Sequence, residues 1–220
     1  MKREILITSD GSTTIHLPDW NEQYHSKHGA IQEAYHVFIK YGLEFLNKKD
    51  ISVLEIGFGT GLNTLITFIE SKKNKQKINY IGVEAYPVSI EEVDKLNYVS
   101  ELNSCDLQDV FNNIHKSSWE EINQLSKYFC LLKRKLFFQD IEYENNFDLI
   151  YFDAFGARVQ PELWTEDIFK KMFNALRENG VLVTYSAKGS VRRAMIAAGF
   201  NVERLPGPPG KREMLRAIKL

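Results

Sequence analysis

The feature that most constrains the fold is a short apolar run that ends in three closely spaced glycines. Residues 51–56 form the run, and Gly57, Gly59 and Gly61 follow it before a helical pattern begins at Leu62. Glycine lets the backbone turn tightly and lets a ligand approach without a Cβ in the way. The next helix presents free N–H groups at its start. We expect a ligand-binding loop here; a tight strand-to-helix turn without a ligand is the alternative.

Strands and helices alternate along the rest of the chain. We expect helices at 30–46, 62–69, 165–177 and 191–198, a polar helical stretch over 89–128, and strands at 78–83, 136–138, 147–152, 181–185, 200–205 and 214–218. The strands are short and apolar on both faces, which predicts an α/β, Rossmann-like fold with a mostly parallel sheet covered by helices on both faces. We expect one domain over 1–220, with an N-terminal extension and cap at 1–48, a core at 49–220 and a helical insertion at about 89–130.

Three acidic residues stand at the expected carboxyl ends of strands. They are Glu84, Asp140 and Asp153. In open parallel sheets the ligand lies beyond these strand ends. Each acid alone is equally consistent with an exposed strand-end carboxylate, but their shared position indicates a site.

The glycine loop does not fit two common nucleotide motifs. The dinucleotide fingerprint needs a sixth-position glycine, where this chain has Leu62 or Thr64, and no Gly-Lys-Ser/Thr follows. What remains resembles class I methyltransferases that use S-adenosyl-L-methionine (SAM). The resemblance implies that the loop from Glu55 through Asn63 passes the amino acid part of SAM. It also implies that Glu84 binds the ribose hydroxyls and that Asp140 contacts the adenine amino group.

Further segments narrow the resemblance. They are Thr8-Ser9-Asp10-Gly11-Ser12, Tyr24-His25-Ser26 with His28-Gly29-Ala30, Glu55-Ile56-Gly57-Phe58-Gly59-Thr60-Gly61-Leu62-Asn63, Phe152-Asp153-Ala154-Phe155-Gly156, Pro161-Glu162-Leu163-Trp164 and Leu205-Pro206-Gly207-Pro208-Pro209-Gly210-Lys211-Arg212-Glu213-Met214. Together they resemble the methyltransferase domain of the MnmC family, over nearly the whole chain. The loop at 156–160 departs from the family pattern. This difference affects what the resemblance implies about the substrate pocket, but not what it implies about the reaction class.

The MnmC resemblance implies a specific reaction. That domain methylates the 5-aminomethyl group of a wobble uridine in tRNA, often a 2-thiouridine, to give the methylaminomethyl form. The chain ends at Leu220, so it resembles a stand-alone methyltransferase, and FAD is not expected. The amine would come from separate enzymes, and the partner would be a tRNA anticodon loop.

The resemblance also implies roles for individual residues. Asp153 is expected to orient the acceptor amine or to take its proton, since a carboxylate can do both; a helix-capping role is the alternative. Phe155 and Trp164 are candidates to stack on the uracil or neighbouring bases, with core filling as the alternative. Tyr24 and Gly29 are expected near the cofactor.

The charge of the chain is unevenly distributed. The net charge is −1, but residues 186–220 hold eight Lys or Arg and two Asp or Glu. A basic segment on an acidic body suggests a local polyanion contact, although a solvated basic face is an equal alternative. The candidates for RNA phosphate contacts are Lys188, Arg192, Arg193, Lys211 and Arg212.

Several other classes of protein find no support in the sequence. No apolar run approaches the roughly 20 residues of a membrane span, and the N-terminus lacks the apolar core of a signal peptide. Cys105 and Cys130 are far apart, and His25 and His28 have no third partner, so no metal site is expected. The simplest interpretation is a cytoplasmic protein.

Two other functions remain open on the sequence. One is a transferase of the same fold, similar to polyamine synthases, that acts on a small-molecule amine without RNA. The other is a SAM- or RNA-binding module without catalysis, against which Asp153 argues weakly.

Overall fold

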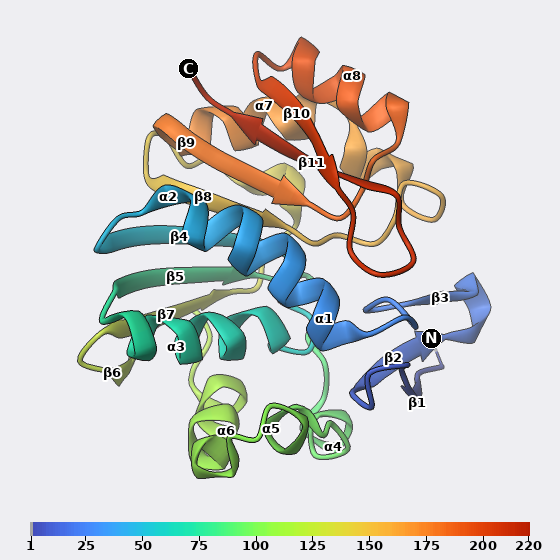
Figure 1. The fold of residues 1–220 in the computed structure, drawn as a ribbon, viewed down its shortest axis with the longest axis vertical. Helices are drawn as coiled ribbons and strands as arrows, with labels where there is room; N and C mark the ends of the chain where they lie inside the picture. The colour runs from blue at the N-terminus through green and yellow to red at the C-terminus, as the bar shows by residue number, and fades with distance from the viewer. Residues whose placement is uncertain (1) are drawn as a thin grey trace.

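The computed structural model describes residues 2–220 and contains one large and one small sheet (Figure 1). The large sheet has the order β10-β11-β9-β8-β4-β5-β7-β6. Its strands are β4 (Asp50–Ile56), β5 (Lys77–Val83), β6 (Ile122–Ser126), β7 (Phe129–Arg134), β8 (Phe147–Phe152), β9 (Leu176–Thr184), β10 (Asn201–Pro206) and β11 (Glu213–Ile218). The five strands from β9 to β7 are parallel, while β6, β10 and β11 join antiparallel at the edges. The expected mostly parallel sheet is confirmed.

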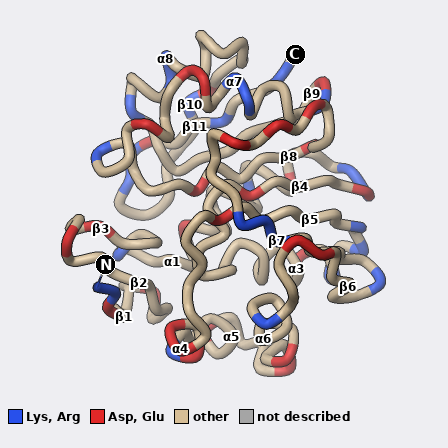
Figure 2. Tube along the Cα trace, turned by 180° about the vertical axis from the view of Figure 1, so that it is seen from behind, with Lys and Arg blue, Asp and Glu red and all other residues tan. Residues whose placement is uncertain are grey.

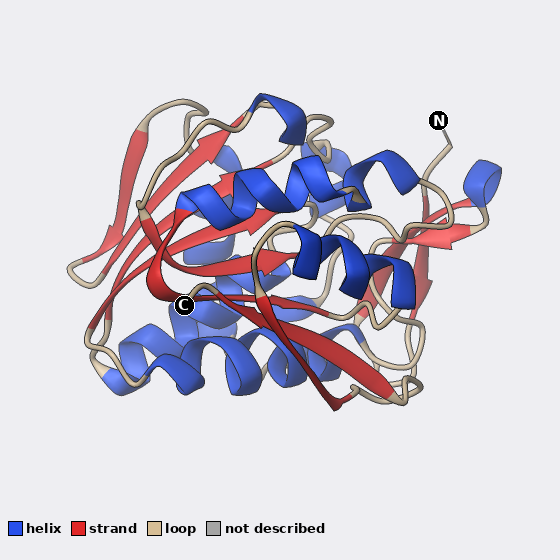
Figure 3. Cartoon of the chain, turned by 90° about the horizontal axis from the view of Figure 1, so that it is seen from above, coloured by secondary structure: helices blue, strands red, loops and turns tan. Residues whose placement is uncertain are grey.

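Helices cover both faces of the large sheet (Figures 1 and 3). On one face lie α3 (Leu62–Asn74), α6 (Gln108–Lys116) and one continuous helix built from α1 (Ala30–Ala34), the π-helical η2 (Tyr35–Leu43) and α2 (Glu44–Leu46). On the other face lie α7 (Glu166–Ala175) and α8 (Gly189–Ala197). In β4, neighbouring residues Val53 and Leu54 are both fully buried, one in each core. A strand covered on both faces is apolar at successive positions, which is the pattern of 51–56.

A small antiparallel sheet lies beside the carboxyl ends of the parallel strands (Figure 1). It consists of β1 (Glu4–Ile7), β2 (Thr13–Leu17) and β3 (Glu22–Gln23), with the 3₁₀ turn η1 (Pro18–Trp20) between the last two. The turn at Asp10-Gly11-Ser12 joins β1 to β2. The helix over 30–46 packs on the large sheet, so only the segment before it stands outside the layered core.

The stretch 89–138 differs from the prediction. It begins with α4 (Ile90–Val93), α5 (Tyr98–Glu101), η3 (Cys105–Leu107) and α6, but continues as β6 and β7 instead of a helix. The strand expected at 136–138 is wrong. The strand that pairs with β5 is β7 instead, and the residues after it form the 3₁₀ turn η4 (Phe138–Asp140). Buried and partly buried residues alternate along β7, and its charged end at Lys133-Arg134 masked the strand pattern. Asp140 therefore lies six residues beyond a strand end.

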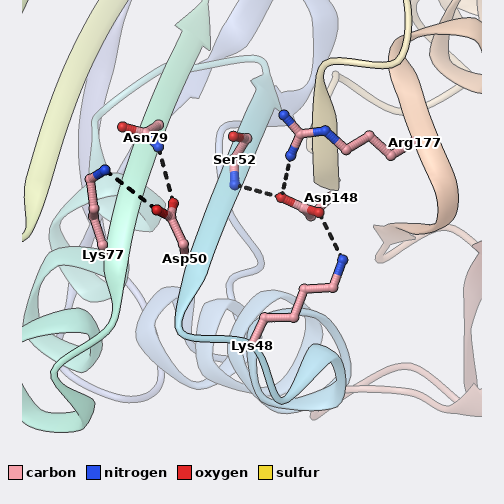
Figure 4. A network of polar contacts seen from close by, with 7 residues as sticks. All are labelled: Lys48, Asp50, Ser52, Lys77, Asn79, Asp148 and Arg177. Carbon is pink, nitrogen blue, oxygen red and sulfur yellow. Dashed lines mark hydrogen bonds and ion pairs between the residues drawn. The ribbon is translucent and has the colours of Figure 1, made fainter.

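The opposite ends of the parallel strands hold an ionic network around the buried Asp148, whose partners Lys48 and Arg177 are partly exposed (Figure 4). The carboxylate of Asp148 accepts hydrogen bonds from Lys48 Nζ at 2.8 Å, from Arg177 Nη1 at 2.8 Å and from the Ser52 amide at 2.9 Å. These contacts tie β4, β8 and β9 together at the ends away from the glycine loop. No helix within residues 2–220 is long and apolar enough to cross a membrane.

Candidate active site

A cavity of about 850 Å³ opens at the carboxyl edge of the large sheet. The glycine loop, the small sheet, and the segments after β5, β7 and β8 form its walls. This volume is in the range of small-molecule sites. The lining residues are Arg3, Leu17, Trp20, Tyr24, Gly57, Gly59, Glu84, Ala85, Tyr86, Ser89, Glu92, Phe137, Phe138, Gln139, Asp153, Ala154, Phe155, Gln160 and Leu163.

The glycine loop needs glycine for both its backbone and its packing. Gly57, Gly59 and Gly61 have φ values of +91°, +48° and +71°, which side chains disfavour. A Cβ on Gly57 would lie 2.6 Å from the carbonyl oxygen of Asp153, and one on Gly61 would lie 2.9 Å from His115 Nε2. Gly57 and Gly59 line the cavity, whereas Gly61 caps α3 behind it. The loop is thus a bare backbone surface that suits close approach of a cofactor such as SAM.

Glu84 follows β5 directly and lines the cavity, as predicted. Its Oε2 accepts a hydrogen bond from the Gly59 amide at 3.1 Å and its Oε1 accepts one from the Tyr86 amide at 2.9 Å. Each carboxylate oxygen keeps a second lone pair for a ligand hydroxyl. The arrangement fits a pair of ribose hydroxyls.

Asp153 follows β8 and lines the same cavity. Its Oδ2 accepts a hydrogen bond from Asn63 Nδ2 at 2.8 Å. Burial, and then the negative charge of Glu33, raise the pKa of Asp153 to about 7, while Asn63 and Lys211 oppose the rise. Near neutral pH this carboxyl can therefore either accept or hold a proton.

Glu55 and Asn63 lie behind the glycine loop and are not among the cavity-lining residues. Glu55 is fully buried and accepts hydrogen bonds from Asn63 Nδ2 at 2.9 Å and from Thr64 Oγ1 at 3.1 Å. Burial raises the pKa of Glu55 to about 8. Both residues brace the loop and Asp153, which differs from the cofactor contact that the motif implied.

Of the other predicted cofactor residues, one lines the cavity and two do not. Tyr24 lines the cavity, with its ring edge-on to Phe155 at 4.9 Å between centroids. Gly29 begins α1 at φ +136°, packed against the Asp10 carboxylate, and is not a lining residue. Asp140 is exposed and also outside the lining, although its neighbour Gln139 belongs to it. The contact of Asp140 with adenine stays a prediction.

The two predicted base-stacking aromatics are in different environments. Phe155 lies in the cavity wall, with Trp20 edge-on at 5.8 Å. Trp164, in the 3₁₀ turn η5 (Pro161–Trp164), is 5% exposed, donates from Nε1 to the Phe155 carbonyl at 2.7 Å and packs on Phe152. Stacking of Trp164 on a base is therefore wrong: it fills the core and supports Phe155.

The residues predicted to contact phosphate differ in their exposure to solvent. Lys188, Arg193 and Arg212 are exposed and Arg192 is half-buried. Lys211 forms an ion pair with Glu33 and keeps a side chain that is 31% exposed. Its contact with phosphate stays a prediction. Figure 2 shows acidic and basic positions interspersed near α8 rather than one continuous basic face.

Some lining residues belong to no motif of the sequence. Arg3 Nη1 pairs with Glu92 Oε2 at 2.9 Å, and both side chains line the cavity. They are 89 positions apart and belong to no motif. The aromatic lining residue Trp20 follows β2, in a segment without a recognisable pattern.

Within residues 2–220, no group of three His, Cys, Asp or Glu could hold a metal ion.

Comparisons with known proteins show the family to which the chain belongs. Residues 107–220 match the model of a family described as S-adenosyl-L-methionine-dependent methyltransferase. The bifunctional protein MnmC of tRNA 5-methylaminomethyl-2-thiouridine biosynthesis from Cupriavidus metallidurans is 28% identical over 96% of this chain and 33% of that protein. This chain thus spans about a third of the length of such curated relatives.

Solved structures also show similarity to an MnmC protein. MNMC2 from Aquifex aeolicus has a TM-score of 0.78 at 25% identity, covering 98% of this chain and 69% of that one. Spermidine synthase from Thermotoga maritima has a TM-score of 0.56 at 15% identity, covering 100% and 72%, which shows the shared fold alone. The resemblance to MnmC proteins is confirmed. On the family match over residues 107–220, the chain belongs to the S-adenosyl-L-methionine-dependent methyltransferase family.

Proposed function

We propose that this enzyme methylates the primary amine of 5-aminomethyluridine, with or without a 2-thio group, at the wobble position of tRNA. The product is the 5-methylaminomethyl form. The observation that carries the proposal is the similarity to MnmC proteins over 96% of the chain, since their name states biosynthesis of this nucleoside. The geometry around Asp153 supports it, because a carboxylate in the cavity wall suits an amine acceptor.

The residues of the cavity divide between cofactor and acceptor. Gly57, Gly59 and Glu84 hold the cofactor, and Tyr24 covers it from the small sheet. Bound SAM supplies an electrophilic methyl carbon attached to a sulfonium. Asp153 lies on the acceptor side, where it orients the amine that attacks this carbon. The protein thus contributes mainly approach geometry.

Proton transfer is the second task of Asp153. A primary alkyl amine is mostly an ammonium near neutral pH and then has no lone pair. Because burial raises the pKa of Asp153 to about 7, the carboxylate is a stronger base than an ordinary aspartate. It accepts a hydrogen bond from the ammonium, and the proton leaves to the carboxylate or through it to water.

The rest of the nucleotide meets the rim of the cavity. Phe155, with Trp20 beside it, offers an aromatic surface for the uracil ring. The exposed Lys188, Arg193 and Arg212, with half-buried Arg192, are the proposed phosphate contacts, and the RNA presents an opened anticodon loop. Separate enzymes supply the aminomethyl precursor.

The test is methyl transfer from isotope-labelled SAM to competing acceptors. The acceptors are tRNA carrying aminomethyluridine, the same tRNA without that group, and free putrescine as a small amine. We expect label only in the first tRNA. Label in putrescine alone would overturn the proposal in favour of a small-molecule transferase, and no label with measurable SAM binding would indicate another acceptor.

A further inference from the structure

Asn63 joins two carboxylates that belong to different parts of the sheet. It lies in the first turn of α3 and is only 3% exposed. Its Nδ2 donates to Oε1 of Glu55 in β4 at 2.9 Å and to Oδ2 of Asp153 after β8 at 2.8 Å. A primary amide has two N–H groups on one nitrogen, so it can serve both acceptors at once.

The amide is held in place from behind. Glu55 is fully buried, and its second oxygen accepts from Thr64 Oγ1 at 3.1 Å. The backbone of Asp153 is also anchored, since its amide donates to the Ile56 carbonyl at 2.9 Å. The side chain of Asp153 is thus fixed through one oxygen, while no residue among 2–220 donates a hydrogen bond to Oδ1.

We propose that Asn63, anchored by Glu55, is a positioning residue that fixes the Asp153 carboxylate for the acceptor amine. This inference rests on the proposed function, in which Asp153 meets the amine. Asn63 itself is outside the cavity lining, so it acts through Asp153 and not on the cofactor. The loop motif alone had placed it with the cofactor.

The groups around Asp153 are mostly acidic, so the Asn63 amide is needed to stabilise its charged form. The ionisable groups around Asp153 are Glu33 from α1, Glu55 from β4, Tyr98 from α5, Tyr185 after β9 and Lys211 from the β10–β11 turn. Only Lys211 is basic, and Asn63 is a hydrogen-bond donor among the acidic groups. Removal of its N–H leaves the charged form of Asp153 less stabilised and its side chain free to rotate.

The experiment compares Asn63→Ala and Asn63→Asp with the control Thr64→Val. Asn63→Asp keeps the shape but removes both donors, and Thr64→Val removes one donor from Glu55 without touching Asp153. The readouts are the Kd for SAM by calorimetry, kcat and KM with aminomethyluridine tRNA, and the pH profile of kcat. SAM binding within about twofold of the unmodified enzyme shows that a variant is folded.

Both Asn63 variants are expected to lose about ten- to a hundredfold in kcat, the worth of a hydrogen bond to a charged group. The acid limb of their pH profile shifts upward, and Thr64→Val leaves kcat and the profile near those of the unmodified enzyme. Equal loss in Thr64→Val, or an unshifted profile, would overturn the positioning role. Should neither variant fold, Asn63→Ser, which keeps one donor, must show the same shift at a smaller size.

A comparison with Asp153→Asn separates this inference from the proposed function. If Asp153→Asn is inactive while both Asn63 variants keep full kcat, the positioning role fails and the proposed function stands. If Asp153→Asn is itself fully active, the role of Asp153 in the proposed function fails, and the positioning role fails with it.

Discussion

The Nζ atom of Lys211 lies 2.5 Å from Oε2 of Glu33, which ties the turn between β10 and β11 to helix α1. The same ammonium lies 3.9 Å from the centroid of the Tyr185 ring. The Tyr185 hydroxyl donates to the Ala154 carbonyl at 2.7 Å, next to Asp153. A basic residue of the C-terminal segment is thus used inside the protein, to fasten this turn to the cavity wall.

Replacing Lys211 with Met should destabilise the protein. Glu33 has a side chain only 8% exposed, so it would lose its ionic partner in a largely buried position. Because Lys211 is itself 31% exposed, we expect a loss of about 1–3 kcal/mol in the free energy of unfolding, less than for a fully buried pair. Urea titration measures it. The exposed Arg212→Met on the same turn is the matched control, and equal stability of the two variants would contradict the assignment.

The exposed basic residues are expected to act on RNA. Lys188→Glu combined with Arg193→Glu should raise the KM for tRNA and make its dependence on log salt shallower by about one unit per lost phosphate contact. The kcat at saturating tRNA should change little. Lys72→Glu, at the far end of α3, is the control. An unchanged KM in the double variant would contradict RNA binding near α8.

Asp153→Asn separates chemistry from cofactor binding. The amide cannot take a proton from the amine, and it presents N–H groups where the carboxylate accepts. We expect kcat to fall by at least about a hundredfold, as for loss of a general base, with the Kd for SAM within twofold. Single-turnover methyl transfer and calorimetry measure the two quantities. An equal loss in both would place Asp153 on the cofactor side.

Glu84→Gln should weaken SAM instead. The change removes the charge that accepts the ribose hydroxyls and disturbs the bond to the Gly59 amide. We expect the Kd for SAM to rise about tenfold or more, in line with a charge-assisted hydrogen bond. Asp140→Asn belongs in the same titration: a higher Kd would support its contact with adenine, and an unchanged Kd would end that prediction.

The buried acids predict how stability depends on pH. The pKa values of Glu55 and Asp153 are raised to about 8 and about 7, so the native state keeps protons that the unfolded chain has released. His25 and His115 have pKa values lowered to about 4, which opposes this trend below their ordinary value of 6.5. Burial lowers the pKa of Lys133 to about 8, which opposes the trend above that pH. The free energy of unfolding should therefore fall as pH rises from about 6.5 to about 8.

Urea titrations at several pH values in this window test the trend. Glu55→Gln removes one of the two titrating groups, so its free energy of unfolding should fall less steeply. A level or rising free energy of unfolding in the unmodified protein, or an unchanged slope in the variant, would contradict the buried acids as its cause.

The parts of the site that the sequence could predict are local in the chain. The glycine loop, Glu84 and Asp153 each follow an apolar strand within a few residues, and the structure places them around one cavity. Asp140 was misplaced because β7 ends in the charged pair Lys133-Arg134, which concealed the strand.

The rest depends on contacts between residues far apart in the chain. Asn63 bonds to Asp153 across 90 positions and Lys211 bonds to Glu33 across 178. Spacing and composition carry no information about such pairs. Trp164 was ambiguous for another reason, since an aromatic residue near a site fills the core or meets the ligand depending on packing alone.

Nucleoside mass spectrometry tests whether this enzyme methylates aminomethyluridine in tRNA. The purified protein is incubated with SAM and tRNA that carries aminomethyluridine at the wobble position, and the digested nucleosides are compared with those of an undermodified tRNA. We expect a gain of one methyl mass on that nucleoside alone, and no gain with Asp153→Asn. A methyl gain on another nucleoside, or none while SAM binding is intact, would contradict it.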